Sequence, residues 1–152
     1  FIINTDDITV EVLGTKFNMS SYQADQMSAV ALVSGSVSVS SNRGKNNVIL
    51  KPNQKYTYEY NHQKVEDVDA YIYTLWTKGL YQFENESFDN IAKRLSRYYG
   101  ISIICDENAS KLTCSGKLDL KDDMNKLLDE LTRALPITFD KVNDKSYLAK
   151  SK

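Results

Sequence analysis

The sequence contains few histidine and cysteine side chains, and their spacing does not form a catalytic or metal-binding set. The chain holds one histidine, His62, and two cysteines, Cys105 and Cys114. A serine or cysteine nucleophile usually needs a base, most often histidine, and His62 follows Asn61 in what reads as a polar, exposed loop. The sequence contains neither a zinc-ligand spacing nor a glycine-rich phosphate loop. We therefore expect no enzyme and no bound metal or cofactor.

Three acidic residues lie close together at Asp119, Asp122 and Asp123. A calcium loop would also need a glycine and a closing glutamate at fixed positions, and these are missing. Carboxylates are favourable at the positive N-terminal end of a helix. We interpret these residues as the acidic start of a helix.

The two cysteines each fall in a predicted strand, and a short loop links those strands. A disulfide between Cys105 and Cys114 would need the strands to pair in the right register in an oxidising compartment. The alternative is two buried free thiols, which behave as small apolar side chains.

Tyrosine is the one residue type that suggests binding, since the chain has ten. Tyr56, Tyr58 and Tyr60 alternate along a predicted strand, and Tyr147 lies in the last one. Tyrosine suits interfaces because it buries a large area and keeps a polar tip. We take these four as candidate partner-binding residues, the alternative for the first three being a half-buried ladder across strands.

The composition is that of an ordinary globular protein, with 41% hydrophobic and 26% charged residues in 152. This length allows one compact domain or two small ones. The formal net charge is −1 and the isoelectric point about 5.9. A nucleic-acid binder needs a concentrated basic face, so this charge balance disfavours one.

The first half alternates apolar and polar residues in short runs, as in Ile8, Val10 and Val12. Turn clusters at residues 42–46 and 51–54 separate these runs. Turns that recur about every ten residues predict an all-β roll, sandwich or solenoid-like domain over residues 1–68.

A connector helix is predicted over residues 69–79. Val68, Ile72, Leu75 and Trp76 follow helical spacing. Acidic residues at positions 66, 67 and 69 would lie at its N-terminal end, and Gly79 would end it.

The second half repeats the order strand, helix, strand. The first pass covers residues 81–83, 87–99 and 101–105, and the second covers 111–117, 122–135 and 137–141. Each helix has a capping residue and one apolar stripe, and a turn at Asn143 leads to a last strand at 146–149. The sequence thus predicts an α+β protein, with a small βαβ-repeat domain over residues 80–152.

The turn sequences resemble a known family. Residues 12–19 and 32–37 resemble the periplasmic FecR-type domain of transmembrane anti-sigma factors. Residues 50–54 are similar to that family's L-x-P-G-Q turn, with Asn53 in place of glycine. Both residue types accept a positive φ, so the replacement is mild.

Residues 76–83 and 88–91, with Gly116, resemble the C-terminal module of the Bacteroidetes versions. That module is similar to the N-terminal signalling domain of secretins and TonB-dependent receptors. The resemblance implies a periplasmic sensor in a protein with one transmembrane helix. It also implies an outer-membrane TonB-dependent transporter as partner and a sigma factor bound by a cytoplasmic region outside this chain.

We expect the contact to form when an exposed sheet edge pairs with the transporter's signalling domain. The candidate edges are the predicted strands at 146–149 and 56–60. Two alternatives stay open: a carbohydrate-binding module that uses the tyrosine face, and a structural module that stacks with itself.

Overall fold

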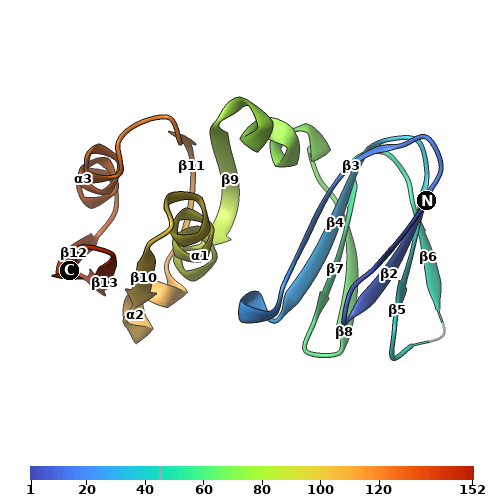
Figure 1. The fold of residues 1–152 in the computed structure, drawn as a ribbon, viewed down its shortest axis with the longest axis horizontal. Helices are drawn as coiled ribbons and strands as arrows, with labels where there is room; N and C mark the ends of the chain where they lie inside the picture. Colours follow the sequence, from blue (N-terminus) through green and yellow to red (C-terminus); the bar gives the residue numbers. More distant parts are fainter. Residues whose placement is uncertain (45) are drawn as a thin grey trace. The chain divides into compact units, whose positions relative to one another are not determined.

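The computed structural model describes residues 1–44 and 46–152 and divides into two compact units, Phe1–Thr74 and Leu75–Lys152. Figure 1 shows that the first unit consists mainly of strands and that the long helices belong to the second. This mixture of sheets and helices confirms the predicted α+β class. The predicted turn at 42–46 includes position 45, which lies outside the described residues.

The N-terminal unit consists of two four-stranded antiparallel sheets. One has the order β1 (Ile2–Asn4), β2 (Ile8–Val12), β5 (Val37–Ser41), β6 (Asn47–Leu50). The other has the order β3 (Lys16–Tyr22), β4 (Met27–Ser34), β7 (Gln54–Glu59), β8 (His62–Asp67). The alternation in each strand directs apolar residues between the sheets, where those of β2, β5, β4 and β7 share one core.

The connector is a 3-10 helix, η2 (Ala70–Lys78), whose ends lie within one residue of the predicted range 69–79. Glu66 and Asp67 belong to β8, where they pair with Lys55 and Gln54. The prediction that they start the helix is wrong, because sheet pairing satisfies their backbone groups. A short 3-10 helix, η1 (Gln23–Asp25), joins β3 to β4.

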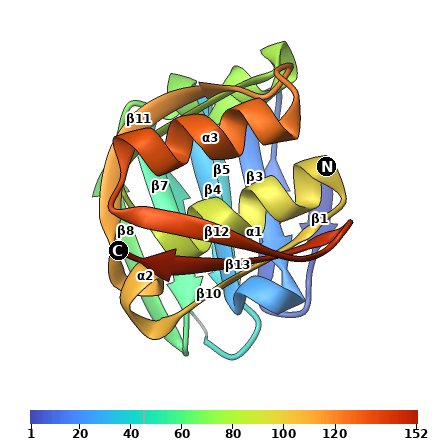
Figure 2. The ribbon, with the colours of Figure 1, turned by 90° about the vertical axis from the view of Figure 1, so that its left-hand side faces the viewer.

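The C-terminal unit has five strands in two sheets. The elements are β9 (Leu80–Ser87), α1 (Phe88–Tyr99), β10 (Ser102–Cys105), α2 (Glu107–Lys111), β11 (Thr113–Asp119), α3 (Met124–Ala134), β12 (Ile137–Asn143) and β13 (Ser146–Ser151). Strands β9 and β11 form one antiparallel pair, and β10-β13-β12 form a sheet in which β10 and β13 are parallel. Figure 2 shows α3 leading into the β12–β13 hairpin.

The two long helices form where their caps and apolar stripes predict. The Asn90 N–H donates to the Ser87 Oγ at 3.2 Å at the start of α1, and Gly100 ends it with a φ of 65°. The stripes of α1 and α3 are buried in one core with residues from both sheets. None of the helices in residues 1–44 and 46–152 combines the length and apolarity that a membrane crossing requires.

The short helix α2 is absent from the sequence-based prediction. It occupies residues up to Lys111, so the strand predicted from position 111 begins at Thr113. Asp106 caps it, since the Asp106 Oδ1 accepts a hydrogen bond from the Ala109 N–H at 2.7 Å. Five residues are too few for a visible apolar period, which explains the omission.

Candidate functional site

The residue types that could do chemistry stay apart in the structure. Within the described part of the chain, three or more His, Cys, Asp or Glu nowhere gather closely enough to hold a metal ion. His62 is exposed, as expected, but it begins β8 and does not lie in a loop. Asp123 does cap α3, because its carboxylate accepts from the Asn125 and Lys126 N–H groups.

Both cysteines are free thiols. Cys105 lies in β10 and Cys114 in β11, and these strands belong to different sheets, so the pairing that a disulfide would need does not occur. Burial, followed by the charges of Asp89 and Asp106, raises the pKa of the Cys105 thiol to about 11. A thiol that stays protonated at neutral pH is a poor nucleophile.

The four candidate tyrosines lie in different environments. Tyr56 and Tyr58 are buried in the N-terminal core, at 0% and 6% exposure, and Tyr147 is buried in the other unit. Tyr60 follows the end of β7, in a turn, and is 68% exposed. The three alternating tyrosines therefore do not form one accessible face. Of the four, Tyr60 alone presents its ring to solvent, and a partner-binding role for any of them stays a prediction.

Both sheet edges predicted from the sequence are wrong. The strand at 146–149 belongs to β13, which has β10 on one side and β12 on the other. The strand at 56–60 belongs to β7, which lies between β4 and β8. Because a neighbour occupies each side, neither strand has main-chain groups free for a partner.

The true edges of the three-stranded sheet are protected. At the β10 edge, the Ile103 N–H donates to the Ser96 Oγ of α1 at 3.0 Å. At the β12 edge, the register shift places Val142 as an extra residue, and Asp140 and Lys141 add charge. Bulges and charged side chains both discourage edge-to-edge pairing.

The β11 edge is open. Two hydrogen bonds at the ends of the β9–β11 ladder fix which way its main chain points. The Phe88 N–H donates to the Leu112 carbonyl at 2.7 Å, and the Leu120 N–H donates to the Gly79 carbonyl at 2.8 Å. In an antiparallel pair, alternate residues direct both main-chain groups towards the partner strand. Even-numbered positions of β11 therefore face β9, and the groups of Thr113, Ser115, Lys117 and Asp119 point away from it.

The exposure and regularity of β11 agree with this assignment. The side chains of Thr113, Ser115, Lys117 and Asp119 are exposed, and Leu118 is buried. The irregularity in the pair falls on β9, where Asn85 has a φ of 48°, so β11 itself runs straight. The tyrosine pattern does not point to this edge. The available signal was the polar residues at alternate positions of β11, which are Thr113, Ser115, Lys117 and Asp119.

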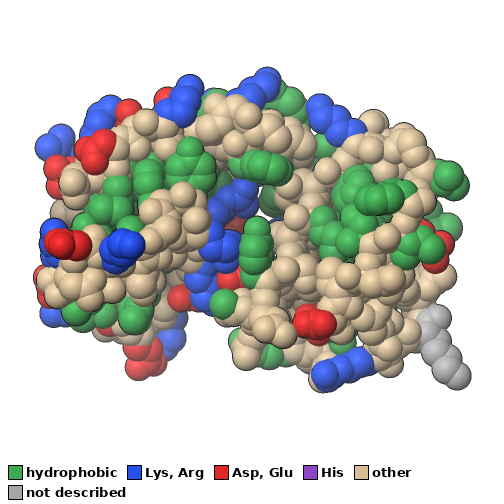
Figure 3. All heavy atoms as spheres, in the orientation of Figure 1, with side chains coloured by type: hydrophobic (Ala, Val, Ile, Leu, Met, Phe, Trp, Pro, Cys, Tyr) green, Lys and Arg blue, Asp and Glu red, His purple; other side chains and the backbone are tan. Residues whose placement is uncertain are grey.

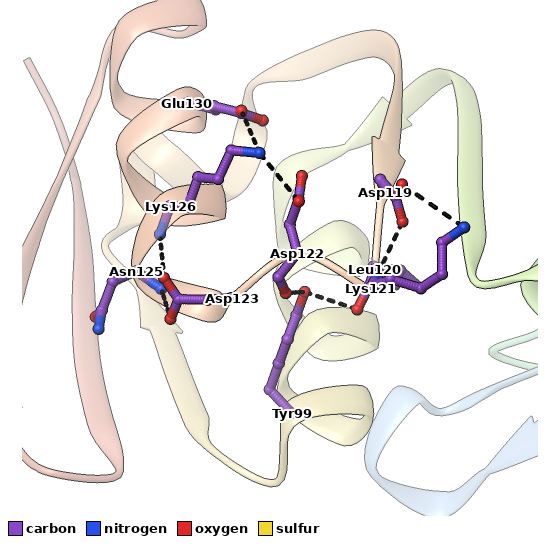
Figure 4. A network of polar contacts seen from close by, with 9 residues as sticks. All are labelled: Tyr99, Asp119, Leu120, Lys121, Asp122, Asp123, Asn125, Lys126 and Glu130. Carbon is purple, nitrogen blue, oxygen red and sulfur yellow. Dashed lines mark hydrogen bonds and ion pairs between the residues drawn. The ribbon is translucent and has the colours of Figure 1, made fainter.

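A partly buried tyrosine hydroxyl fixes the end of this edge. The Tyr99 hydroxyl donates a shared hydrogen bond to the carbonyls of Leu120, at 3.1 Å, and Asp122, at 3.0 Å (Figure 4). Desolvation, with smaller effects from Tyr98 and the nearby aspartates, raises the pKa of Tyr99 and keeps it protonated. This shared hydrogen bond, which we call the Tyr99 lock, therefore holds the turn between β11 and α3.

The surface charges of the C-terminal unit are mixed. Figure 3 shows Lys and Arg side chains among Asp and Glu side chains on its visible face. Several pairs join residues four apart on a helix, such as Lys93 with Asp89 at 2.8 Å and Lys126 with Asp122 at 3.0 Å. Exposed pairs of this kind contribute little stability and give no concentrated basic face.

Comparisons with known proteins identify a family model and solved structures that this chain resembles. Residues 80–148 match the family model described as FecR, C-terminal. Two crystal structures of a candidate anti-sigma factor from Parabacteroides distasonis ATCC 8503 share the fold, with TM-scores of 0.87 and 0.86 at 24% sequence identity, over 100% of this chain and 71% of theirs. No curated protein matches the sequence. The match over residues 80–148 bears out, for that part of the chain, the resemblance to FecR-type anti-sigma factors that the sequence indicates.

Proposed function

We propose that this chain is the periplasmic sensor part of an anti-sigma factor. It receives its signal by contact with the N-terminal signalling domain of an outer-membrane TonB-dependent transporter. That contact controls release of an extracytoplasmic-function sigma factor, held by a cytoplasmic region of the same membrane-anchored protein. The observation that carries the proposal is the FecR C-terminal match over residues 80–148. In this scheme residues 1–68 and 80–152 are the two sensor domains, and 69–79 connect them.

The open β11 edge supports a mechanism by strand addition. An incoming strand would pair with the outward main-chain groups of Thr113, Ser115 and Lys117. Main-chain hydrogen bonds supply affinity in this mode, and alternate side chains supply specificity. The small side chains at 113 and 115 allow a close approach. The proposed contact makes and breaks no covalent bond, in keeping with a regulatory protein.

The experiment is a calorimetric titration of the whole chain with the signalling domain of the TonB-dependent transporter encoded beside it. Lys117→Pro removes one outward N–H and leaves the β9 ladder intact, since proline is tolerated where an edge N–H faces solvent. We expect it to weaken binding at least about tenfold, because it removes a main-chain hydrogen bond and blocks the edge.

Val65→Pro is the matched control. Val65 lies on the β8 edge of the other unit, and the Val68 N–H to Asn53 carbonyl bond at 3.0 Å places the Val65 N–H outward by the same alternation. Its affinity should equal that of the parent chain. Absence of binding by the parent chain at high micromolar concentration would overturn the proposed function, and equal loss in both variants would overturn the β11 assignment.

A further inference from the structure

A depression of about 430 Å³ lies at one end of the N-terminal unit, between the β5–β6 and β7–β8 turns. Its lining includes Ser41, Arg43, Tyr58, Asn61 and Gln63. An acidic side chain is missing from the lining residues that the structure describes. Among these described lining residues, the Arg43 guanidinium is the one charged group and the others are neutral, so its charge meets no carboxylate there.

Two tyrosine hydroxyls fix the orientation of the amides. The Tyr58 hydroxyl donates to the Asn61 Oδ1 at 3.1 Å, and the Tyr56 hydroxyl donates to the Gln63 Oε1 at 3.3 Å. The Arg43 Nη1–H also donates to the Asn61 Oδ1, at 3.2 Å. Both amide oxygens are thus engaged, so each amide keeps its two N–H donors for another molecule.

The backbone that presents Asn61 is strained. Glu59 pairs with His62, so Tyr60 and Asn61 alone form the hairpin loop, with φ values of 47° and 64°. Such two-residue loops favour Asn and Gly, and a positive φ is a genuine outlier for a bulky residue such as tyrosine. Strain of this kind is held where surrounding structure demands it, often at binding sites. Here it places the Asn61 side chain between Tyr58 and Arg43.

We propose that this depression binds a carboxylate carried on a hydroxylated ring, as in a hexuronic acid. The remaining Arg43 N–H groups suit the carboxylate, and the Asn61 and Gln63 N–H donors suit ring and hydroxyl oxygens. The volume exceeds that of a lone inorganic anion, given a share of about 30 Å³ for one water.

The test is calorimetry of the whole chain with galacturonate, galactose and acetate. Galacturonate should bind at least about tenfold more tightly than either of the others, because it alone supplies both the charge and the ring oxygens. Arg43→Gln should abolish this preference. Lys51→Gln, which removes an exposed cation from a turn of the same unit, should retain it.

A second variant and a spectroscopic readout test the positioning role of the tyrosine. Tyr58→Phe keeps the ring and removes the hydroxyl that orients Asn61, so galacturonate should bind several-fold more weakly. In the parent chain, galacturonate should shift the NMR signals of the Asn61 and Gln63 side-chain amides. Acetate bound as tightly as galacturonate would mark an adventitious ion only. Equal affinity for acetate and galacturonate would overturn the proposal. So would the absence of galacturonate binding at millimolar concentration, or an unchanged galacturonate affinity in Arg43→Gln.

Discussion

The two units manage their sheet edges differently. In the N-terminal unit, β1 and β6 have three and four residues, and β8 carries charged side chains along an exposed strand. In the C-terminal unit, a helix hydroxyl covers β10 and a bulge interrupts β12, but β11 has neither device. Short, charged or bulged edges resist pairing. The β3 edge (Lys16–Tyr22) spans seven residues with one charged side chain, so an unprotected edge is found in both units. We propose β11 for the partner because it lies within the residues that match the FecR C-terminal model.

The units also differ in what fixes their polar groups. In the N-terminal unit, tyrosine hydroxyls orient amides at one end of the sandwich. In the C-terminal unit, side chains cap helices and lock the turn after β11. The first arrangement leaves amide donors for the small ligand that we propose, and the second leaves a straight strand for the proposed polypeptide partner. The following substitutions would break or sharpen this contrast.

The largest effect is expected in the helix-covered core. Phe88 is fully buried at the start of α1, with the Phe139 ring 6.2 Å away between centroids. Phe88→Ala should lower the free energy of unfolding of the C-terminal unit by about 3–5 kcal/mol, because it leaves a cavity. Urea denaturation followed by circular dichroism measures this change. Val142→Ala, at an exposed bulge, should cost less than about 0.5 kcal/mol, and equal effects would contradict the burial of Phe88.

A smaller effect is expected at the turn before β7. Asn53 has a φ of 62°, and its Oδ1 accepts a hydrogen bond from the Ala70 N–H at 3.2 Å, at the start of η2. Asn53→Ala loses that bond and keeps the unfavourable φ, so it should destabilise the N-terminal unit by about 2 kcal/mol. Glycine adopts this positive φ without a steric cost, so the free energy of unfolding of Asn53→Gly should stay within about 0.5 kcal/mol of the parent value. Thermal unfolding that ranks glycine below alanine would contradict this account.

The Tyr99 lock should contribute less. Tyr99→Phe removes the shared hydrogen bond to Leu120 and Asp122 and should cost about 1 kcal/mol of unfolding free energy. The neighbouring Tyr98 is half-exposed, so Tyr98→Phe is the control and should be near neutral. Urea midpoints compare the two variants. If the lock positions β11, amide exchange after Tyr99→Phe should also quicken in the turn at 119–122.

The smallest effect concerns alkaline pH. The Cys105 thiol has its pKa raised by burial to about 11 in the folded chain, from an ordinary 9.0. Above pH 9 the unfolded chain releases this proton and the folded chain keeps it, so stability falls as pH rises from 9 to 11. Cys105→Ala should make the fall in melting temperature over this range shallower. Buried Tyr81, whose phenol pKa is also raised by desolvation, should leave a remaining slope, and an identical slope would contradict the shift.

Local signals predicted the regular elements well. Ser87 and Gly100 mark the ends of α1, and the apolar stripes of α1 and α3 are buried. The alternation in β2 and β7 places their apolar residues in the core. These signals are local because caps and periodicity act within a few residues. The short helix α2 lacks such a signal.

The binding surfaces depended on information that the sequence does not carry locally. Whether β7, β13 or β11 is an edge depends on strand order, which long-range pairing determines. The role of Asn53 in capping η2 joins residues 17 positions apart. The tyrosine pattern at 56–60 was read as one face, and the chain turns at Tyr60 instead. The family resemblance indicated an anti-sigma factor, and the strand order directed the proposed contact to β11.

Hydrogen–deuterium exchange of β11 tests the central claim most directly. The whole chain is compared alone and with the transporter signalling domain in excess. Strand addition predicts slower exchange at the outward amides of Thr113, Ser115 and Lys117, with β12 and β8 unchanged. Binding that leaves β11 exchange unaltered, or protects another edge, would contradict the account.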